Sequence, residues 1–136
     1  MRQLLIAILF ATATLSCSKK DDNTPPAITK ENISGTYKIT SVKVNGAEFI
    51  DQAFEPCQKD DLVKLEANGT VTYIDAGTKC SPAGDDSGTW DLSGNTLTLD
   101  SETATIQSFD GNNLVVSAEY DLAGSTVPAV ITFAKQ

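Results

Sequence analysis

The chain has 136 residues, enough for one domain, and carries 10 Lys and Arg against 18 Asp and Glu, a formal net charge of −8. This acidic balance repels phosphate backbones and argues against a nucleic-acid partner. No histidine is present, which excludes Ser-His-Asp and Cys-His catalysis and histidine-ligated zinc. Because no spacing typical of lysine or paired-carboxylate catalysis is found either, we expect a non-catalytic protein without a metal or cofactor.

The N-terminal segment reads as a targeting signal. Arg2 supplies one positive charge, and an uncharged run rich in Leu, Ile and Ala follows from Leu4 to Leu15. This run is shorter than the roughly 20 residues that a membrane-spanning helix needs. Residues 1–16 are therefore predicted to be a signal peptide and are left out of the fold prediction.

Cys17 ends the leader, and its context indicates lipidation. The stretch Thr-Leu-Ser-Cys (14–17) resembles the lipobox of bacterial lipoproteins, in which the cysteine is acylated and becomes the new N-terminus. The residues that follow, Ser-Lys-Lys-Asp-Asp, resemble the surface-export signal of lipoproteins in some Gram-negative bacteria. The resemblance implies a lipid anchor in the outer membrane with display on the cell surface. A periplasm-facing anchor and an ordinary signal peptide with an incidental cysteine are the alternatives.

Residues 17–32 are predicted to form the lipidated cysteine and a flexible tether. They are polar and contain Pro25-Pro26, which favours extended backbone. No apolar period begins before Ile33. The folded domain is therefore expected to span residues 33–136.

From Ile33 onward, short β-rich runs alternate with turn residues. The expected strands are 35–44, 62–67, 70–76, 88–92, 96–99, 104–109, 113–122 and 126–135. Asn68-Gly69 and Asp110-Gly111 between such runs are typical of tight hairpins. The one candidate helix, of a turn or two, lies in 49–57. These features predict an all-β fold, an eight-stranded antiparallel up-and-down barrel whose closure removes exposed edges; a β-sandwich is the alternative.

Alternation along the strands divides the side chains between two faces. The side chains assigned inward are Tyr37, Ile39, Val63, Leu65, Val71, Tyr73, Trp90, Leu92, Leu97, Leu99, Leu114, Val116, Ala118, Ile131 and Phe133. The candidate ligand-cavity residues among them are Tyr37, Ile39, Leu65, Tyr73, Trp90, Leu97, Val116 and Phe133. A barrel of this size holds either one small ligand or a filled core of side chains, and both remain open here.

Three stretches resemble the lipocalin-like domain of bacterial surface lipoproteins. ISGTYKITSVKVNG (33–46) resembles the family's opening L-x-G-x-W strand, with Tyr37 in the place of Trp. CQKDDLVKLEANGTV (57–71) resembles its C-x-x-D-D stretch with a following N-G-T, and GDDSGTWDLSGNTLTL (84–99) resembles its G-x-W-x-L-x-G stretch. The resemblance covers residues 33–136. It implies a lipocalin-like barrel that binds a small hydrophobic ligand.

The same resemblance implies a disulfide, because the two cysteines of that family usually pair. This would link Cys57 to Cys80. The cysteine count agrees, since two cysteines remain if Cys17 is acylated. The alternative, a reactive thiol pair, lacks the C-x-x-C spacing of redox motifs. The bond would tie the loop before strand 62–67 to the long loop 77–87.

Two acidic pairs, Asp60-Asp61 and Asp85-Asp86, lie near the expected disulfide and are predicted to converge. Clustered carboxylates can bind calcium. Neither pair has the spaced ligands of a calcium loop, so solvated acidic loops are favoured.

The sequence thus predicts a lipid-anchored, non-catalytic binding module for a small hydrophobic ligand. The alternative is a protein–protein module such as a protease inhibitor. In that case residues 24–34 would form a binding arm, and loop 77–87 would contact the protein partner.

Overall fold

The structure is a computed structural model and describes residues 24–136. The predicted signal peptide (1–16) and the lipidation site Cys17 lie outside the described residues, as does the predicted tether up to residue 23. Between residues 24 and 136, no helix is long and apolar enough to cross a bilayer.

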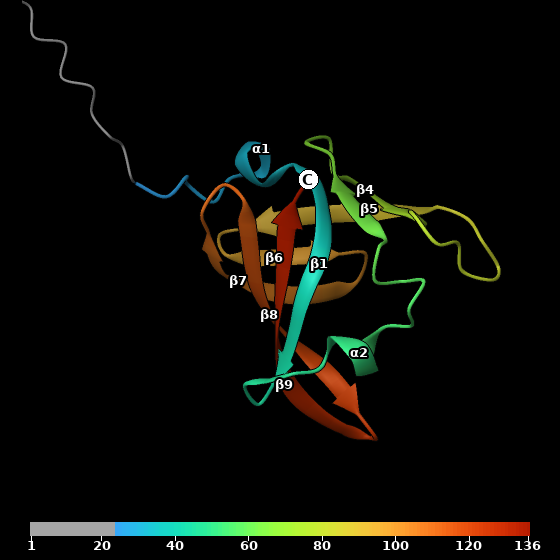
Figure 1. Cartoon of the computed structure of the whole chain (residues 1–136). Helices are drawn as coiled ribbons and strands as arrows, with labels where there is room; N and C mark the ends of the chain where they lie inside the picture. The colour runs from blue at the N-terminus through green and yellow to red at the C-terminus, as the bar shows by residue number, and fades with distance from the viewer. Residues whose placement is uncertain (1–23) are drawn as a thin grey trace, which may run out of the picture.

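The chain forms a closed antiparallel barrel of eight strands (Figure 1). These strands are β1 (Gly35–Val44), β3 (Leu62–Leu65), β4 (Thr70–Ile74), β5 (Asp86–Ser93), β6 (Thr96–Leu99), β7 (Glu102–Phe109), β8 (Asn113–Leu122) and β9 (Ser125–Lys135). Each strand pairs with the next barrel strand along the chain, and β9 pairs back with β1. The predicted up-and-down barrel is therefore confirmed, and the ring of pairings excludes the sandwich alternative.

Three short elements complete the fold: α1 (Lys30–Ile33), β2 (Ala47–Glu48) and α2 (Ile50–Ala53). β2 pairs only with the end of β1, and its hairpin turns at Asn45 and Gly46, which both have positive φ. α2 is the single turn expected within 49–57. α1 was not expected from the sequence. Thr29 caps this helix, because its Oγ1 accepts a hydrogen bond from Asn32 N at 3.2 Å.

Two β-bulges change which side chains face inward. On β1, register shifts between Ile39 and Ser41, so the inward positions pass from Tyr37 and Ile39 to Val42 and Val44. β7 has the same irregularity between Ile106 and Ser108, which turns both Ile106 and Phe109 inward. Strict alternation, on which the inward prediction rested, runs from Ala104 to Ile106 but does not place Val42, Val44 or Phe109 in the interior.

One end of the barrel is filled by aromatic side chains and covered by α1. Ile33, Tyr37 and Trp90 are buried there, at 0%, 1% and 3% exposure. Tyr37 Oη donates to the Ile33 carbonyl at 2.7 Å, and Trp90 Nε1 donates to the Glu66 carbonyl at 2.7 Å. Lys30 Nζ lies 5.1 Å from the Trp90 ring centroid. We call this the closed end; the C-terminus reaches it beside α1 (Figure 1).

The predicted tether does not remain separate from the barrel over its last residues. Ile28 packs against the hydrophobic core, and Lys30 Nζ pairs with Asp91 Oδ1 at 2.9 Å. Residues 28–32 thus lie against the closed end, whereas residues 24–27 are exposed.

Candidate functional site

The opposite end, which we call the mouth, lies where β1 continues beyond β3. β3 pairs only with residues 35–38 of β1, and beyond them the same side of β1 is paired only by the short β2, at Lys43 and Val44. The Glu48 side chain occupies part of the gap between these two pairings. Its Oε1 accepts a hydrogen bond from Val42 N at 2.9 Å, and its Oε2 accepts one from Ser41 Oγ at 2.6 Å. These bonds hold the pKa of the Glu48 carboxyl below its usual value, with the Ser41 bond the largest cause. Because β1 is not paired along its whole length on this side, the wall of the barrel opens beside Ile39.

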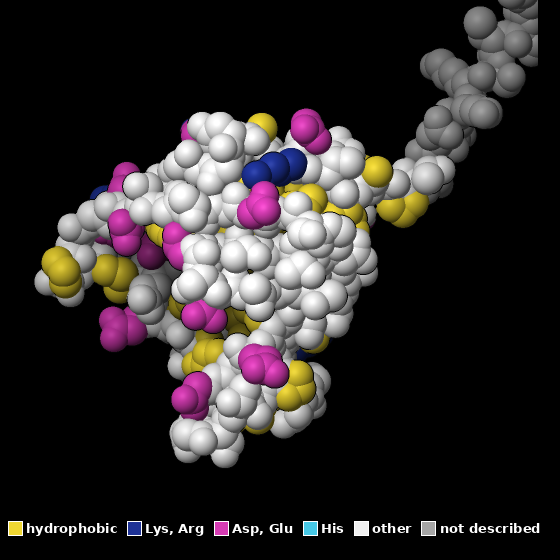
Figure 2. Space-filling model, turned by 180° about the vertical axis from the view of Figure 1, so that it is seen from behind, with side chains coloured by type: hydrophobic (Ala, Val, Ile, Leu, Met, Phe, Trp, Pro, Cys, Tyr) yellow, Lys and Arg dark blue, Asp and Glu magenta, His cyan; other side chains and the backbone are white. Residues whose placement is uncertain are grey.

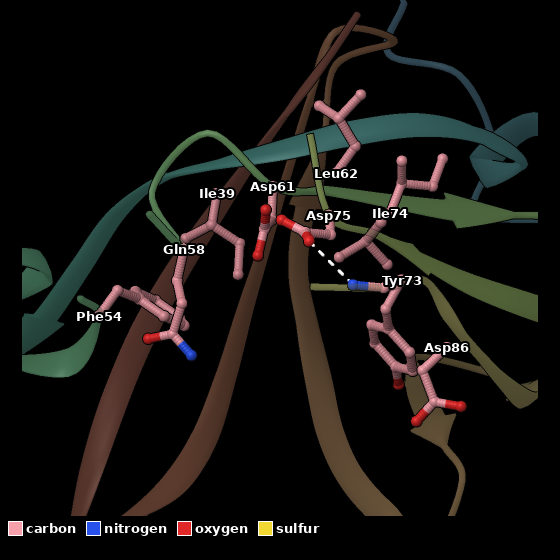
Figure 3. A pocket seen from close by; sticks show the side chains of 11 residues that line it. Ile39, Phe54, Gln58, Asp61, Leu62, Tyr73, Ile74, Asp75 and Asp86 are labelled. Carbon is pink, nitrogen blue, oxygen red and sulfur yellow. Dashed lines mark hydrogen bonds between the residues drawn. The ribbon is translucent and has the colours of Figure 1, made fainter. Parts of the chain in front are cut away.

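A pocket of about 260 Å³ occupies this opening. Its lining comes from strands β1, β3 and β4 and the start of β5, from the segment after α2, and from the connection between β4 and β5. The lining residues are Ile39, Phe54, Gln58, Asp61, Leu62, Val63, Tyr73, Ile74, Asp75, Gly84 and Asp86. Most of the lining is apolar, and the polar groups at its edge are chiefly carboxylates (Figure 3).

A disulfide and a buried aspartate position the edge of this pocket. Cys57 and Cys80 are bonded, with their Cα atoms 5.3 Å apart, which confirms the predicted pairing and ties the segment after α2 to the β4–β5 connection. Asp75, only 6% exposed, accepts from Gly84 N at 3.0 Å through Oδ2 and from Cys80 N at 3.3 Å through Oδ1. These two hydrogen bonds hold residues 75–84 around the Asp75 carboxylate.

The two acidic pairs predicted to converge do come together here. Asp60 Oδ2 accepts from Thr78 N at 2.8 Å, and Asp61 Oδ1 accepts from Ala76 N at 3.1 Å. Asp85 Oδ1 accepts from Asp75 N at 3.0 Å. Three aspartates therefore bind backbone amides of the β4–β5 connection, and these hydrogen bonds are the reason that their carboxylates lie close together.

One group of potential metal ligands occurs among residues 24–136: Asp61, Asp75 and Cys80. The Cys80 sulfur is already bonded to Cys57, and both Asp75 oxygens accept amide hydrogens. Asp60 Oδ1 is buried without a hydrogen-bond partner, but it lies outside this group. The donor set does not fit a calcium ion, which needs six to eight free oxygen ligands.

Tyr73 crosses the pocket from β4 toward the β6–β7 hairpin. Its hydroxyl lies 3.2 Å from Asp100 Oδ2, and Asp100 Oδ1 accepts from Thr89 N at 2.9 Å. Burial, followed by the nearby charges of Asp100 and Asp86, raises the pKa of Tyr73 to about 12. The phenol therefore stays neutral at physiological pH and forms one wall of the pocket (Figure 3).

A second pocket of about 220 Å³ lies on the other side of the interior, toward the same mouth. Its lining residues are Leu97, Leu99, Glu102, Thr103, Ala104, Val116, Ala118, Glu119, Ile131 and Phe133. Ile39 lines the first pocket and its cross-strand partner Phe133 lines the second, so the two adjoin at this pair. From behind, the molecule shows a hollow with hydrophobic side chains at its bottom and acidic ones at its edge (Figure 2).

The predicted cavity residues divide into three groups. Ile39 and Tyr73 line the first pocket. Leu97, Val116 and Phe133 line the second. Tyr37, Leu65 and Trp90 line neither and belong to the packed core at the closed end. The interior is thus filled in one half and open in the other, which combines the two alternatives left by the sequence.

Several pocket residues were not identified from the sequence. Phe54, Gln58 and Asp75 lie outside the regular strands, where a period of two gives no information. The usable signal was the disulfide, because residues beside Cys57 and Cys80 are brought to one edge of the barrel.

Comparison with known proteins gives one match. A family model described as a lipocalin-like domain matches residues 33–116, from the last residue of α1 into β8. No curated protein and no solved structure matches the chain significantly.

Proposed function

Because the chain belongs to the lipocalin-like domain family, we propose that its barrel binds a small hydrophobic ligand in the pocket beside Ile39. A lipocalin-like barrel is in general a non-catalytic binding fold. The observation that carries the proposal is the asymmetry of the interior: Tyr37 and Trp90 fill the closed end, whereas an apolar pocket opens at the mouth. A barrel that needed only a core would be expected to pack both halves alike.

The dimensions of the pocket limit the ligand. About 260 Å³ is slightly below the 300–1,000 Å³ range of sites for drug-sized molecules. The adjoining pocket offers about 220 Å³ more if Ile39 and Phe133 move aside. A compact apolar molecule, or one short alkyl chain, matches this space better than a long-chain lipid.

Binding of the neutral fluorophore N-phenylnaphthylamine tests the proposal. Its fluorescence should rise on mixing with the protein. Val63→Phe adds bulk to a pocket-lining position and should abolish most of this rise. Val115→Phe is the matched control, because Val115 lies on β8 next to the inward Leu114 and Val116 but lines neither of these pockets. An equal response from both variants would contradict a binding site at the mouth.

We also propose that Cys17 is lipidated and anchors the protein in the outer membrane, with display on the cell surface. The lipobox-like Thr14–Cys17 and the charged residues after it support this. Metabolic labelling with palmitate should mark the protein, and Cys17→Ala should remove the label. Protease treatment of intact cells separates the two orientations: a surface protein is degraded, whereas a periplasm-facing one is protected.

The loop between Gly77 and Asp85 favours a second candidate function, protein–protein contact. The loop is exposed and projects from the barrel (Figure 1), yet it is held by the Cys57–Cys80 bond and by Asp60 and Asp75. A rigid exposed loop lowers the entropic cost of binding a partner. This candidate function is tested by measuring inhibition of a panel of serine proteases by the unchanged protein and by a variant with Pro82→Ala and Ala83→Gly. Absence of inhibition by the unchanged protein would reject the inhibitor role.

A further inference from the structure

The charge around the first pocket is one-sided. Its lining includes the carboxylates of Asp61, Asp75 and Asp86, and among the described residues no Lys or Arg lines it. Two lysines lie in the neighbouring segments: Lys79 Nζ donates to the main-chain carbonyl of Asp75, and Lys59 Nζ pairs with Asp51 Oδ1. Asp60 and Asp85 stand directly behind this edge, so negative charge exceeds positive charge at the entrance.

Two of the three lining carboxylates have an oxygen free for a ligand. Asp61 uses Oδ1 for Ala76 N, and Asp86 uses Oδ1 for Ser87 N; the hydrogen bonds of residues 24–136 leave Oδ2 of both without a partner. Asp75 differs because both of its oxygens bind amides. Asp61 lies on the Ile39 side of the pocket and Asp86 on the Tyr73 side (Figure 3).

We propose that the ligand is an apolar molecule bearing a protonated amine, with its hydrocarbon part between Ile39, Val63 and Tyr73 and its ammonium group at the acidic edge, beside Asp61 or Asp86. This inference rests on the proposed function and specifies the ligand class of the same site. An ammonium donates up to three hydrogen bonds and attracts carboxylates, whereas a fatty-acid carboxylate would meet like charge with no cation to receive it. The lining therefore selects for cationic amphiphiles and against anionic ones.

The second pocket also has acidic side chains in its lining. Glu102 and Glu119 are its charged lining residues, and they lie beside apolar side chains such as Leu99 and Ile131. An extended ligand that passed between Ile39 and Phe133 would still find only negative charge at the other opening. The overall charge of −8 adds to this preference, and its long-range part is screened by salt.

The test compares three probes with the same alkyl chain: n-octylamine, n-octanol and n-octanoate, titrated by isothermal calorimetry at neutral pH and low ionic strength. The amine should bind at least roughly tenfold more tightly than the carboxylate, with the alcohol between, a difference that one or two partly solvated ion pairs can produce. Added salt should reduce this ratio.

Variants localise the effect. Asp61→Asn together with Asp86→Asn keeps an acceptor for Ala76 N and Ser87 N, and should bring the ratio of amine to alcohol affinity towards one. Glu55→Gln is the matched control, since Glu55 is an exposed acid of the same segment that does not line the pocket. An amine preference that survives the double Asn variant would overturn the assignment to Asp61 and Asp86.

The remaining outcomes distinguish the two proposals. If n-octanol binds but n-octanoate binds as tightly as n-octylamine, the charge preference is wrong and the hydrophobic site stands. If none of the three probes binds, the proposed function itself fails and the inference falls with it.

Discussion

Tyr37 shows how one residue closes the barrel. Its ring is buried, burial raises its pKa to about 12, and its hydroxyl donates to the Ile33 carbonyl at 2.7 Å. Tyr37→Phe would leave that carbonyl buried without its donor, at a cost of about 1–2 kcal/mol in the free energy of unfolding. Urea denaturation measures this loss. Tyr120→Phe is the control, because the Tyr120 hydroxyl makes no hydrogen bond within residues 24–136; equal losses in both variants would contradict this role of Tyr37.

Asp75 is the residue on which the edge of the first pocket depends. Asp75→Ala removes the acceptor of Cys80 N and Gly84 N and should release the loop while the barrel strands remain paired. Amide hydrogen exchange should therefore accelerate at Cys80 and Gly84 and stay slow in β8 and β9. Asp121→Ala, which removes the acceptor of Gly124 N in the β8–β9 hairpin, should leave the exchange of Cys80 and Gly84 unchanged. Unchanged exchange in Asp75→Ala would show that the disulfide and the bonds from Asp60 and Asp61 hold the loop without Asp75.

At the scale of elements, the connection between β4 and β5 depends on the disulfide. Cys57 and Cys80 are 23 residues apart in the chain, and the chain-entropy model predicts about 3 kcal/mol of stabilisation from closing such a loop. Replacing both cysteines by serine should lower the free energy of unfolding by that amount and weaken ligand binding at the mouth. Denaturation curves with and without reductant provide the check: the unchanged protein should lose stability on reduction, and the double serine variant should not.

The strands were predictable because most of them follow a strict period of two. Leu97 and Leu99 on β6 and Val63 and Leu65 on β3 alternate with polar side chains, as a half-buried strand requires. Phe109 was missed because the bulge near Ser108 shifts the inward parity within β7. α1 was missed because one helical turn has too few residues to show a period.

The site was less predictable than the barrel. Inward alternation identified Ile39 and Tyr73, but it could not separate them from Tyr37 and Trp90, which fill the closed end. That division depends on α1 covering one end of the barrel and on β3 being shorter than β1. Both are relations between distant segments, and no local pattern of the sequence encodes them.

Acid sensitivity belongs to the scale of the whole molecule. The pKa values of Glu48, Glu66, Asp91 and Asp110 are lowered, chiefly by hydrogen bonds from Ser41, Lys64, Lys30 and the backbone N–H of Asn113 respectively. A carboxyl whose pKa is lower in the folded state contributes stability above its unfolded pKa of about 4, and this contribution is lost as pH falls through the folded value. Thermal unfolding midpoints should therefore be level near neutral pH and fall below about pH 4. Glu48→Gln should make this fall shallower, and an unchanged pH profile in that variant would contradict the assignment.

The two ends of the molecule have different roles in this account. The chain enters the barrel at the closed end, through residues 24–28 and α1, and the C-terminus returns there (Figure 1). If Cys17 is lipidated as proposed, six residues lie between it and Thr24, so the two residues are at most about 25 Å apart. This short connection would hold the closed end near the membrane and leave the mouth accessible from solution.

The most direct test of the central claim is a heteronuclear NMR titration of the protein with n-octanol, which carries no charge and so probes the pocket alone. We expect saturable shifts at Ile39, Val63 and Tyr73, which line the mouth, and unchanged signals at Tyr37 and Trp90 in the packed closed end. Absence of saturable shifts at the mouth, or shifts confined to the outer face of the strands, would contradict a binding role for this pocket.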